Sequence, residues 1–249
     1  MPRFFVRASQ IGIADDGKKT VMIPGEDASH ITRSLRMKAG DSLVVCDMAG
    51  VEYDCKLTSV GETVFADVIS ERKTDTEPPY KATLYQALVK GDKFDTVVQK
   101  AVECGASRIV PVLTERCVVR LTKKDCEKKR ARWQRIADEA AKQCGRGALV
   151  EVAGLLTFKE AVEEAARSDI SLFCYEGENG TTLKFALSIL PRDPGTISFM
   201  IGSEGGFSVK EAETALAAGM TPVGLGKRIL RTETASSFVL SCLAYEYEL

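Results

Sequence analysis

Two glycine-punctuated loops near the end of the chain hold the residues best suited to binding chemistry. The first reads GSEGG over residues 202–206, with the carboxylate of Glu204 in its middle and no lysine. A phosphate cradle needs bare backbone amides and a lysine, as in the pattern GxxxxGK[ST]. Because a carboxylate repels phosphate but tolerates a neutral or cationic ligand, this loop favours a positively charged small molecule. An enzyme that binds nucleotide phosphates is the least favoured alternative.

The second loop carries the opposite charge. It follows an apolar run at residues 222–225 and brings Lys227, Arg228 and Arg231 within five residues. Clustered cations of this kind suit a polyanion such as a nucleic acid strand. Both loops follow a predicted strand, the first at residues 197–201, and both precede a predicted helix. This is the arrangement of ligand sites at the carboxyl ends of parallel strands.

Composition limits where such a site can come from. The 249 residues carry a net charge of −1, with 45% hydrophobic and 28% charged residues, so a polyanion must be bound by local clusters. The eight cysteines form no CxxC pair and His30 is the single histidine, so we expect no metal site. With no run of eighteen apolar residues and no signal-peptide pattern, the sequence predicts a cytoplasmic protein without a membrane span.

A polar segment at residues 72–79, which ends in two prolines, is typical of a linker. Three β-rich runs precede it, at residues 41–46, 52–57 and 64–69. A short helix is predicted among them at residues 26–37, with Ala28, Ile31 and Leu35 as its apolar stripe. The sequence therefore predicts two domains, residues 1–72 and residues 73–249.

Strands and helices alternate after the linker, which predicts an α/β domain with a mostly parallel sheet. The predicted strands are residues 82–89, 107–113, 149–152, 170–175, 197–201 and 222–225. Helices are predicted at residues 92–104, 122–144 and 208–218, and Gly105 and Gly219 end the first and the last of these. Ser208 and Glu211 have the spacing of a capping box.

The chain resembles the RsmE type of SPOUT methyltransferase in motifs spread over nearly its whole length. These motifs are HITRSLRMKAGD, KGDKFDTVVQKAVECGASRIVPVLTERC, RWQRIADEAAKQCGR, GSEGGFS and LGKRILRTETA. The resemblance implies methylation of N3 of one uridine in small-subunit ribosomal RNA, with S-adenosylmethionine as cofactor. It also implies a PUA-like RNA-binding barrel at residues 1–72, a trefoil-knotted domain at residues 73–249, and a homodimer with the pocket near its interface.

By the same resemblance, the two loops hold the adenine, ribose and methionine parts of S-adenosylmethionine. The cofactor-binding residues that it implies are Ile201, Gly202, Glu204, Gly205, Leu225, Gly226, Ile229, Leu230, Arg231, Thr234 and Ala235. The carboxylate of Glu204 could offset the sulfonium charge, or it could hold a ribose or a loop amide.

Arg231 and Glu233 are the candidate catalytic residues. Uracil N3 is a poor nucleophile until its proton leaves, and the Arg231 guanidinium could stabilise the anion that forms on the flanking carbonyl oxygens. Glu233 could accept the proton or orient the loop. The alternative is structural: Thr232 caps the last helix, and Glu233 complements the dipole of its first turn.

Basic residues gather around the predicted helix at residues 122–144. Residues 114–146 hold eleven lysines and arginines against five acids, a local net charge of +6. We expect either a solvated face or a phosphate-contacting surface. The candidate RNA-binding residues are Arg3, Arg7, His30, Arg33, Arg36, Arg116, Lys128, Arg135, Gln143 and Arg146.

Two other functions stay open. A related SPOUT branch methylates ribose 2′-oxygens and also carries a GSEG-type loop, but its last loop differs from ILRTETA. The second open function is a non-catalytic RNA-binding factor for ribosome assembly. The intact GSEGGFS and LRTETA loops argue against it. The substrate is either free ribosomal RNA or the assembled small subunit.

Overall fold

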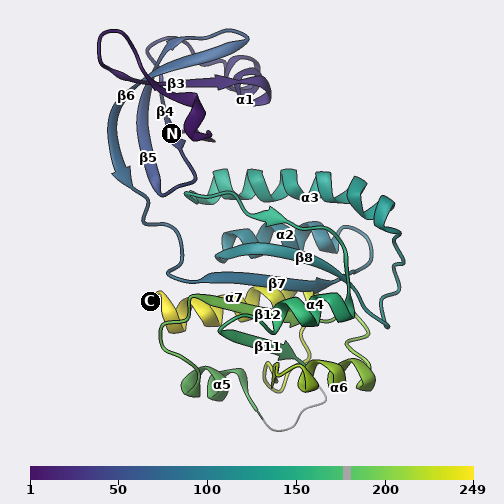
Figure 1. The fold of residues 1–249 in the computed structure, drawn as a ribbon. Coiled ribbons are helices and arrows are strands. Elements are labelled where there is room, and N and C mark those ends of the chain that lie inside the picture. Colours follow the sequence, from purple (N-terminus) through teal and green to yellow (C-terminus); the bar gives the residue numbers. More distant parts are fainter. Residues whose placement is uncertain (176–180) are drawn as a thin grey trace. The chain divides into compact units, whose positions relative to one another are not determined.

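A computed structural model describes residues 1–175 and 181–249 of the protein, and the chain divides into two compact units (Figure 1). Unit 1 is Met1–Glu77 with Ala141–Leu149, and unit 2 is Pro78–Ala140 with Val150–Leu249. The segment predicted as a linker, residues 72–79, contains the point where the chain first passes from unit 1 into unit 2. In the described part of the chain, no helix is long and apolar enough to cross a membrane.

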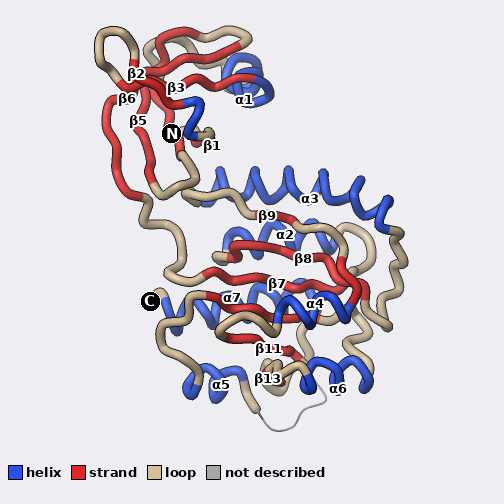
Figure 2. Tube along the Cα trace, viewed as in Figure 1, coloured by secondary structure: helices blue, strands red, loops and turns tan. Residues whose placement is uncertain are grey.

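Unit 1 is built on a six-stranded sheet in the order β1-β4-β5-β6-β3-β2. Figure 2 shows strands of this unit in red. Its strands are β1 (Arg3–Phe5), β2 (Ile11–Ile13), β3 (Lys19–Pro24), β4 (Ser42–Cys46), β5 (Val51–Ser59) and β6 (Thr63–Lys73), and a 3₁₀ turn, η1 (Ala8–Gln10), follows β1. Only β1 and β4 pair in parallel. The three predicted β-rich runs are confirmed as β4, β5 and β6. Tyr53, Cys55 and Leu57 alternate into the core, as the two-residue period of a strand requires.

One helical segment packs on this sheet. It consists of α1 (Gly25–Ser29) and a π-helical turn, η2 (His30–Ser34). Ala28 and Ile31 are fully buried, as expected. The expectation for Leu35 is wrong, because the helix ends at Ser34 and Leu35 no longer lies on its apolar face; 40% of the residue is exposed. Arg36 follows with a φ of 52°, which ends any helical continuation.

Unit 2 contains a parallel sheet in the order β10-β8-β7-β12-β11-β13, with β9 pairing to β8. Its strands are β7 (Lys81–Ala87), β8 (Ala106–Leu113), β9 (Glu151–Val152), β10 (Leu156–Thr157), β11 (Ile170–Cys174), β12 (Thr196–Ile201) and β13 (Thr221–Val223). Every pairing among them is parallel, which confirms the predicted sheet. All carboxyl ends therefore lie at one edge, and the loops that leave them meet there.

Helices cover both faces of the parallel sheet (Figure 1). They are α2 (Lys93–Glu103), α3 (Lys123–Cys144), α4 (Phe158–Ala165), α5 (Leu183–Ile189), α6 (Val209–Ala217) and α7 (Thr232–Tyr247). Helices α2 and α7 pack together, while α4 and α6 share a core with Phe173 and Phe207. The predicted capping box of α6 is confirmed: Ser208 Oγ accepts the Glu211 amide, and the Glu211 carboxylate accepts the Ser208 amide.

A buried ion pair inside unit 1 overturns one expected RNA contact. The Arg146 guanidinium is 4% exposed and donates to Glu77 through Nε at 2.8 Å and Nη2 at 2.6 Å. Glu77 Oε1 also accepts the amides of Gly147 and Ala148. Burial alone would raise the pKa of Glu77, but Arg146 and the two amides outweigh it and hold the pKa below its usual value. Arg146 is therefore a structural residue of unit 1 rather than a surface contact.

Glu77→Gln should destabilise unit 1 by about 3 kcal/mol at pH 7, because it removes the negative charge that faces the buried Arg146 guanidinium. Since the pKa of Glu77 is lowered by folding, its contribution is complete above the ordinary value of 4.5 and is lost as the pH falls below it. Chemical unfolding of wild type and variant from pH 7 to pH 3 measures this difference. The exposed pair Lys100–Glu103 is the control, and Glu103→Gln should cost less than about 1 kcal/mol. A constant difference at every pH would contradict the assignment.

Candidate functional site

Three segments meet at the carboxyl edge of the parallel sheet through a buried hydrogen-bonded junction. The Thr232 hydroxyl, in the first turn of α7, donates to the Gly202 carbonyl at 2.7 Å. It accepts from Nε2 of Gln86, near the end of β7, at 2.9 Å. Gln86 is fully buried and Thr232 is 6% exposed. The start of the GSEGG loop, the end of β7 and the start of α7 are therefore fixed to one another.

This junction corrects the structural role expected for Thr232. Helix α7 begins at Thr232, and the residue at the N-cap position is Arg231, with extended backbone. The Arg231 carbonyl accepts the amides of Thr234 and Ala235 at 2.9 and 2.8 Å. The Thr232 side chain therefore does not cap the helix, because its hydroxyl is committed to Gly202. Glu233 lies in the first turn, as expected, where its charge suits the helix dipole.

Glu204 holds the first loop against the segment that follows β7. Its Oε1 accepts the Lys90 amide at 3.3 Å and the Lys93 ammonium at 3.0 Å. Burial works to raise the pKa of Glu204, but amide hydrogen bonds and Lys93 lower it below its ordinary value, so the carboxylate is charged at neutral pH. Of the roles considered for Glu204, the structure contains the bond to a loop amide. Lys93 is a partner that the sequence analysis missed, because it lies 111 residues from Glu204 along the chain.

Arg116 holds the same loop from the other side. Its Nη1 donates to the Gly205 carbonyl at 3.1 Å, and its own carbonyl accepts the Ser203 hydroxyl at 3.2 Å. A Cβ at Gly205 would lie 3.2 Å from Cβ of Arg116, so the glycine allows this close approach. Arg116 was expected to contact RNA. It is exposed, but its guanidinium also braces the loop at residues 202–206.

The two candidate catalytic side chains flank this junction in sequence. Arg231 is exposed, and within residues 1–175 and 181–249 its guanidinium has no hydrogen bond or ion pair. Glu233 has one oxygen, Oε2, buried without a hydrogen-bond partner among the described residues. A cation and a carboxylate oxygen, both without partners among the described residues, are the kinds of group that deprotonation of a weak acid needs.

The structure brings together only part of the expected cofactor set. Through Gly202 and Thr232, the residues at 201–205 are fixed to those at 231–235. Ile201 and Ala235 are buried, whereas Ile229 is 83% exposed. The residues of the second loop, Leu225, Gly226, Ile229 and Leu230, make no hydrogen bond to the first loop in the described part of the chain. Thr234 and Gly226 are exposed, and Gly226 has a φ of 104° that favours glycine.

The expected RNA-binding residues divide between surface and interior. Arg7, Arg36, Lys128, Arg135 and Gln143 are exposed, and so are His30 and Arg33. Arg3 is partly buried, and its guanidinium pairs with the buried carboxylate of Glu52 at 2.5 Å. Arg146 is the one that is buried. Lys128 and Arg135 lie on α3 away from Trp133 and Ala137, which are buried.

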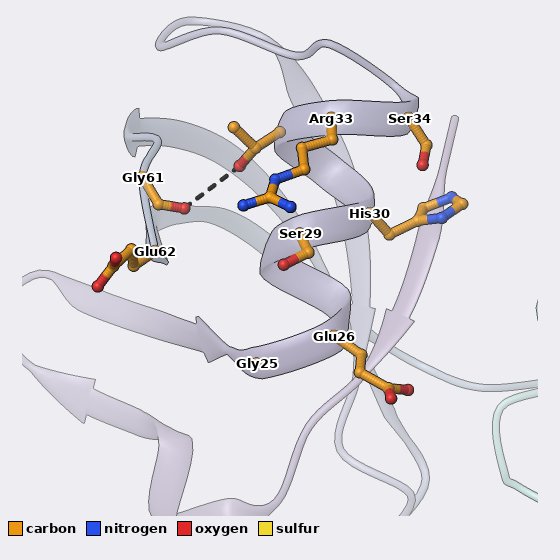
Figure 3. A pocket seen from close by; sticks show the side chains of 9 residues that line it. Gly25, Glu26, Ser29, His30, Arg33, Ser34, Gly61 and Glu62 are labelled. Atoms are coloured by element: carbon orange, nitrogen blue, oxygen red, sulfur yellow. Dashed lines mark hydrogen bonds between the residues drawn. The ribbon is translucent and has the colours of Figure 1, made fainter.

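His30 and Arg33 line a hollow of about 880 Å³ in unit 1 (Figure 3). Its other lining residues are Gly25, Glu26, Ser29, Thr32, Ser34, Gly61 and Glu62. The Thr32 hydroxyl donates to the Ala28 carbonyl at 2.7 Å and also lies 3.3 Å from the Gly61 carbonyl, the bond drawn in Figure 3. Among the described residues, no group of three or more His, Cys, Asp or Glu is placed to hold a metal ion.

Two family models match the chain. The RNA methyltransferase domain matches residues 76–244, and the RNA methyltransferase PUA domain matches residues 23–66. The ribosomal RNA small subunit methyltransferase E of Bacillus subtilis is 34% identical, over 100% of this chain and 98% of its own length.

Two solved structures with bound S-adenosylmethionine are similar over nearly the full length. The ribosomal RNA small subunit methyltransferase E of Neisseria gonorrhoeae is 31% identical with a TM-score of 0.83. A methyltransferase described as putative, from Legionella pneumophila, is 30% identical with a TM-score of 0.84. Each comparison covers 98% of this chain and 97% of the other.

Gly202→Ala should disturb the first loop, because a Cβ there would lie 3.0 Å from Cα of Gly206 and 3.1 Å from its carbonyl carbon. These are backbone atoms, so the crowding should cost about 1–3 kcal/mol. We expect faster hydrogen exchange of the Gly206 amide, which donates to Ser203 at 2.9 Å, and a lower thermal midpoint. Gly12→Ala is the control, since no such atom lies closer than 4.0 Å to its added Cβ. Unchanged hydrogen exchange of the Gly206 amide in the Gly202 variant would show that the loop can accommodate a Cβ at this position, which would contradict the prediction.

Proposed function

The chain belongs to the ribosomal RNA small subunit methyltransferase E family, and from this premise we propose that it methylates N3 of a uridine in small-subunit ribosomal RNA. The methyl donor is S-adenosylmethionine. The observation that carries the proposal is the hydrogen bond from Thr232 to Gly202. Through this bond, Arg231 and Glu233 stand next to the loop expected to hold the donor.

The residues present fit such a donor. Bound S-adenosylmethionine supplies a methyl group on a positively charged sulfur, which makes that carbon open to attack by a nucleophile. The charged carboxylate of Glu204 favours a cationic ligand over a phosphate. The glycine backbone at residues 202–206 and at Gly226 offers amides and carbonyls at close range. We assign Ile201, Ala235 and the other expected cofactor residues to this pocket.

Two side chains have separate roles in the reaction of the RNA base: one accepts a proton and the other stabilises negative charge. The N3 proton of uracil passes to the Glu233 carboxylate, whose Oε2 has no hydrogen-bond partner among the described residues. The electron pair left on N3 then bonds to the methyl carbon as the bond from that carbon to sulfur breaks and leaves a neutral thioether. The exposed guanidinium of Arg231 stabilises the negative charge that develops on the two carbonyl oxygens beside N3. Holding nucleophile and methyl carbon in line contributes a further ~7–11 kcal/mol.

Membership of the family establishes an RNA methyltransferase that uses S-adenosylmethionine. We propose the domain roles, oligomeric state, knot and cellular location as follows. We assign residues 1–72 to RNA binding and residues 73–249 to methyl transfer. We further propose a homodimer, a knotted C-terminal segment and a place in the cytoplasm, where ribosomal RNA is found. RNA phosphates would contact the exposed residues Arg7, His30, Arg33, Arg36, Arg116, Lys128, Arg135 and Gln143.

Mass spectrometry of nucleosides tests the target atom. The purified protein is incubated with S-adenosylmethionine and small ribosomal subunits from a strain that lacks it, and the RNA is then digested. We expect N3-methyluridine in the digest, and a methylated ribose in its place would move the enzyme to the 2′-oxygen branch. Calorimetry with S-adenosylmethionine tests the assembly-factor alternative, which predicts no binding at millimolar concentration.

Arg231→Ala should lower the single-turnover rate about 10²–10³-fold, because the charge on the base is left unstabilised. The affinity for S-adenosylmethionine, measured by calorimetry, should change much less. Arg167→Ala removes an exposed cation outside the site and is the matched control. An unchanged rate in the Arg231 variant would remove this residue from catalysis.

Reversing Lys128 and Arg135 to Glu should weaken RNA binding and flatten its salt dependence. Each lost phosphate contact reduces the slope of log K against log salt by about 0.7–0.9, so the pair should reduce it by about 1.4–1.8. Filter binding from 50 to 300 mM salt measures this slope. Reversing Lys159 and Lys210, exposed on α4 and α6, gives the same change in net charge and should leave the slope unaltered. Equal slopes for both pairs would mean that the α3 face is only solvated.

A further inference from the structure

The side-chain amide of Gln86 has two ends in different situations. Its Nε2 donates to the Thr232 hydroxyl at 2.9 Å and to the Ala87 carbonyl at 3.1 Å, and lies 3.5 Å from the Gly202 carbonyl. Its Oε1 is buried and has no hydrogen-bond partner among the described residues. The residue is fully buried, near the end of β7. The nitrogen of the Gln86 amide is therefore held by hydrogen bonds, whereas its oxygen lacks one among the described residues.

The orientation of this amide is fixed by its surroundings. The carbonyls of Ala87 and Gly202 can only accept hydrogen bonds, and the hydroxyl proton of Thr232 is donated to Gly202. Turning the amide over would place Oε1 against these acceptors, so the nitrogen must face them. The unpartnered Oε1 is therefore a property of the site rather than of an amide drawn the wrong way round.

The position of Oε1 follows from covalent geometry. It shares a carbon atom with Nε2, so it lies at the same junction as Gly202 and Thr232. Gly202 belongs to the loop assigned to S-adenosylmethionine, and Thr232 lies between Arg231 and Thr234, which are assigned to it as well. An acceptor buried without a donor destabilises the folded chain, and such groups in native proteins are usually paired by a ligand, an ion or a water.

We propose that Gln86 Oε1 accepts a hydrogen bond from an N–H or O–H group of bound S-adenosylmethionine. This inference rests on the proposed function and adds a binding residue that the loop motifs do not contain. S-adenosylmethionine has three kinds of group that could donate this hydrogen bond: the α-amino group, the ribose hydroxyls and the adenine amino group. Because Nε2 is anchored to Gly202 and Thr232, the amide loses little further side-chain freedom on binding; Oε1, buried in the ligand-free chain, is reached when the neighbouring loop moves to admit the ligand.

Gln86→Leu tests this bond, because leucine fills a similar volume and cannot accept it. We expect the Kd for S-adenosylmethionine, measured by calorimetry, to rise at least tenfold. The thermal midpoint of the ligand-free protein should fall by a few degrees, because the variant also removes the hydrogen bonds that Nε2 donates to Thr232 and to the Ala87 carbonyl. Gln86→Met serves as a second apolar replacement in case the leucine variant does not fold.

Ser107→Ala is the matched control. Ser107 Oγ is also buried without a hydrogen-bond partner among the described residues, but it lies near the beginning of β8, at the opposite edge of the parallel sheet from the carboxyl ends. Its removal should leave the Kd for S-adenosylmethionine unchanged. A wild-type Kd in the foldable Gln86 variants, or a loss of affinity equal to that of the Ser107 variant, would overturn the inference. If the wild-type protein itself bound no S-adenosylmethionine, the proposed function would fail instead.

Discussion

One buried hydrogen bond, from the Thr232 hydroxyl to the Gly202 carbonyl, joins the loop after β12 to the start of α7, where the loop after β13 ends. The sheet alone would keep these two loops apart. The strands that end in these loops, β12 and β13, are separated by β11. Two strand spacings, about 10 Å, must therefore be crossed, and the eight residues between β13 and α7 can reach that far. Because a buried carbonyl without a donor is costly, the bond also selects this path over looser ones. The bond also fixes the positions of Arg231 and Glu233, the residues on either side of Thr232.

The charged residues around this junction hold the first loop in place as well as favour a ligand of opposite charge. The sequence presents an acidic loop and a basic loop, as if each served its own ligand. In the folded chain, Glu204 is bound by Lys90 and Lys93, and Arg116 donates to Gly205. The first loop is thus held from both sides by segments that carry basic residues. Glu204 retains its charge in this setting, so it can favour a cation while it holds the loop in shape.

Much of the fold is predictable because it depends on local periodicity, whereas tertiary partners are not. The parallel strands and the capping box of α6 follow from apolar runs and from the spacing of Ser208 and Glu211. Arg146 was expected on a basic surface because other basic residues lie near it in the chain. Its partner Glu77 lies 69 residues away, and a local count of charges cannot reveal such a distant pair. The role of Thr232 was missed for the same reason. Gln86 did leave a signal, a glutamine inside the apolar run ATLYQALV, which packing rules alone do not explain.

The most direct measurement is a crystal structure of the protein with S-adenosylmethionine, or its demethylated product, and a short RNA that contains the target uridine. We expect the sulfur against residues 202–206 and the uracil ring between it and Arg231, with N3 facing the Glu233 carboxylate. A base bound at another edge of the sheet would contradict the proposed site. So would a triphosphate or dinucleotide seated against residues 202–206 with no room left for the sulfonium compound.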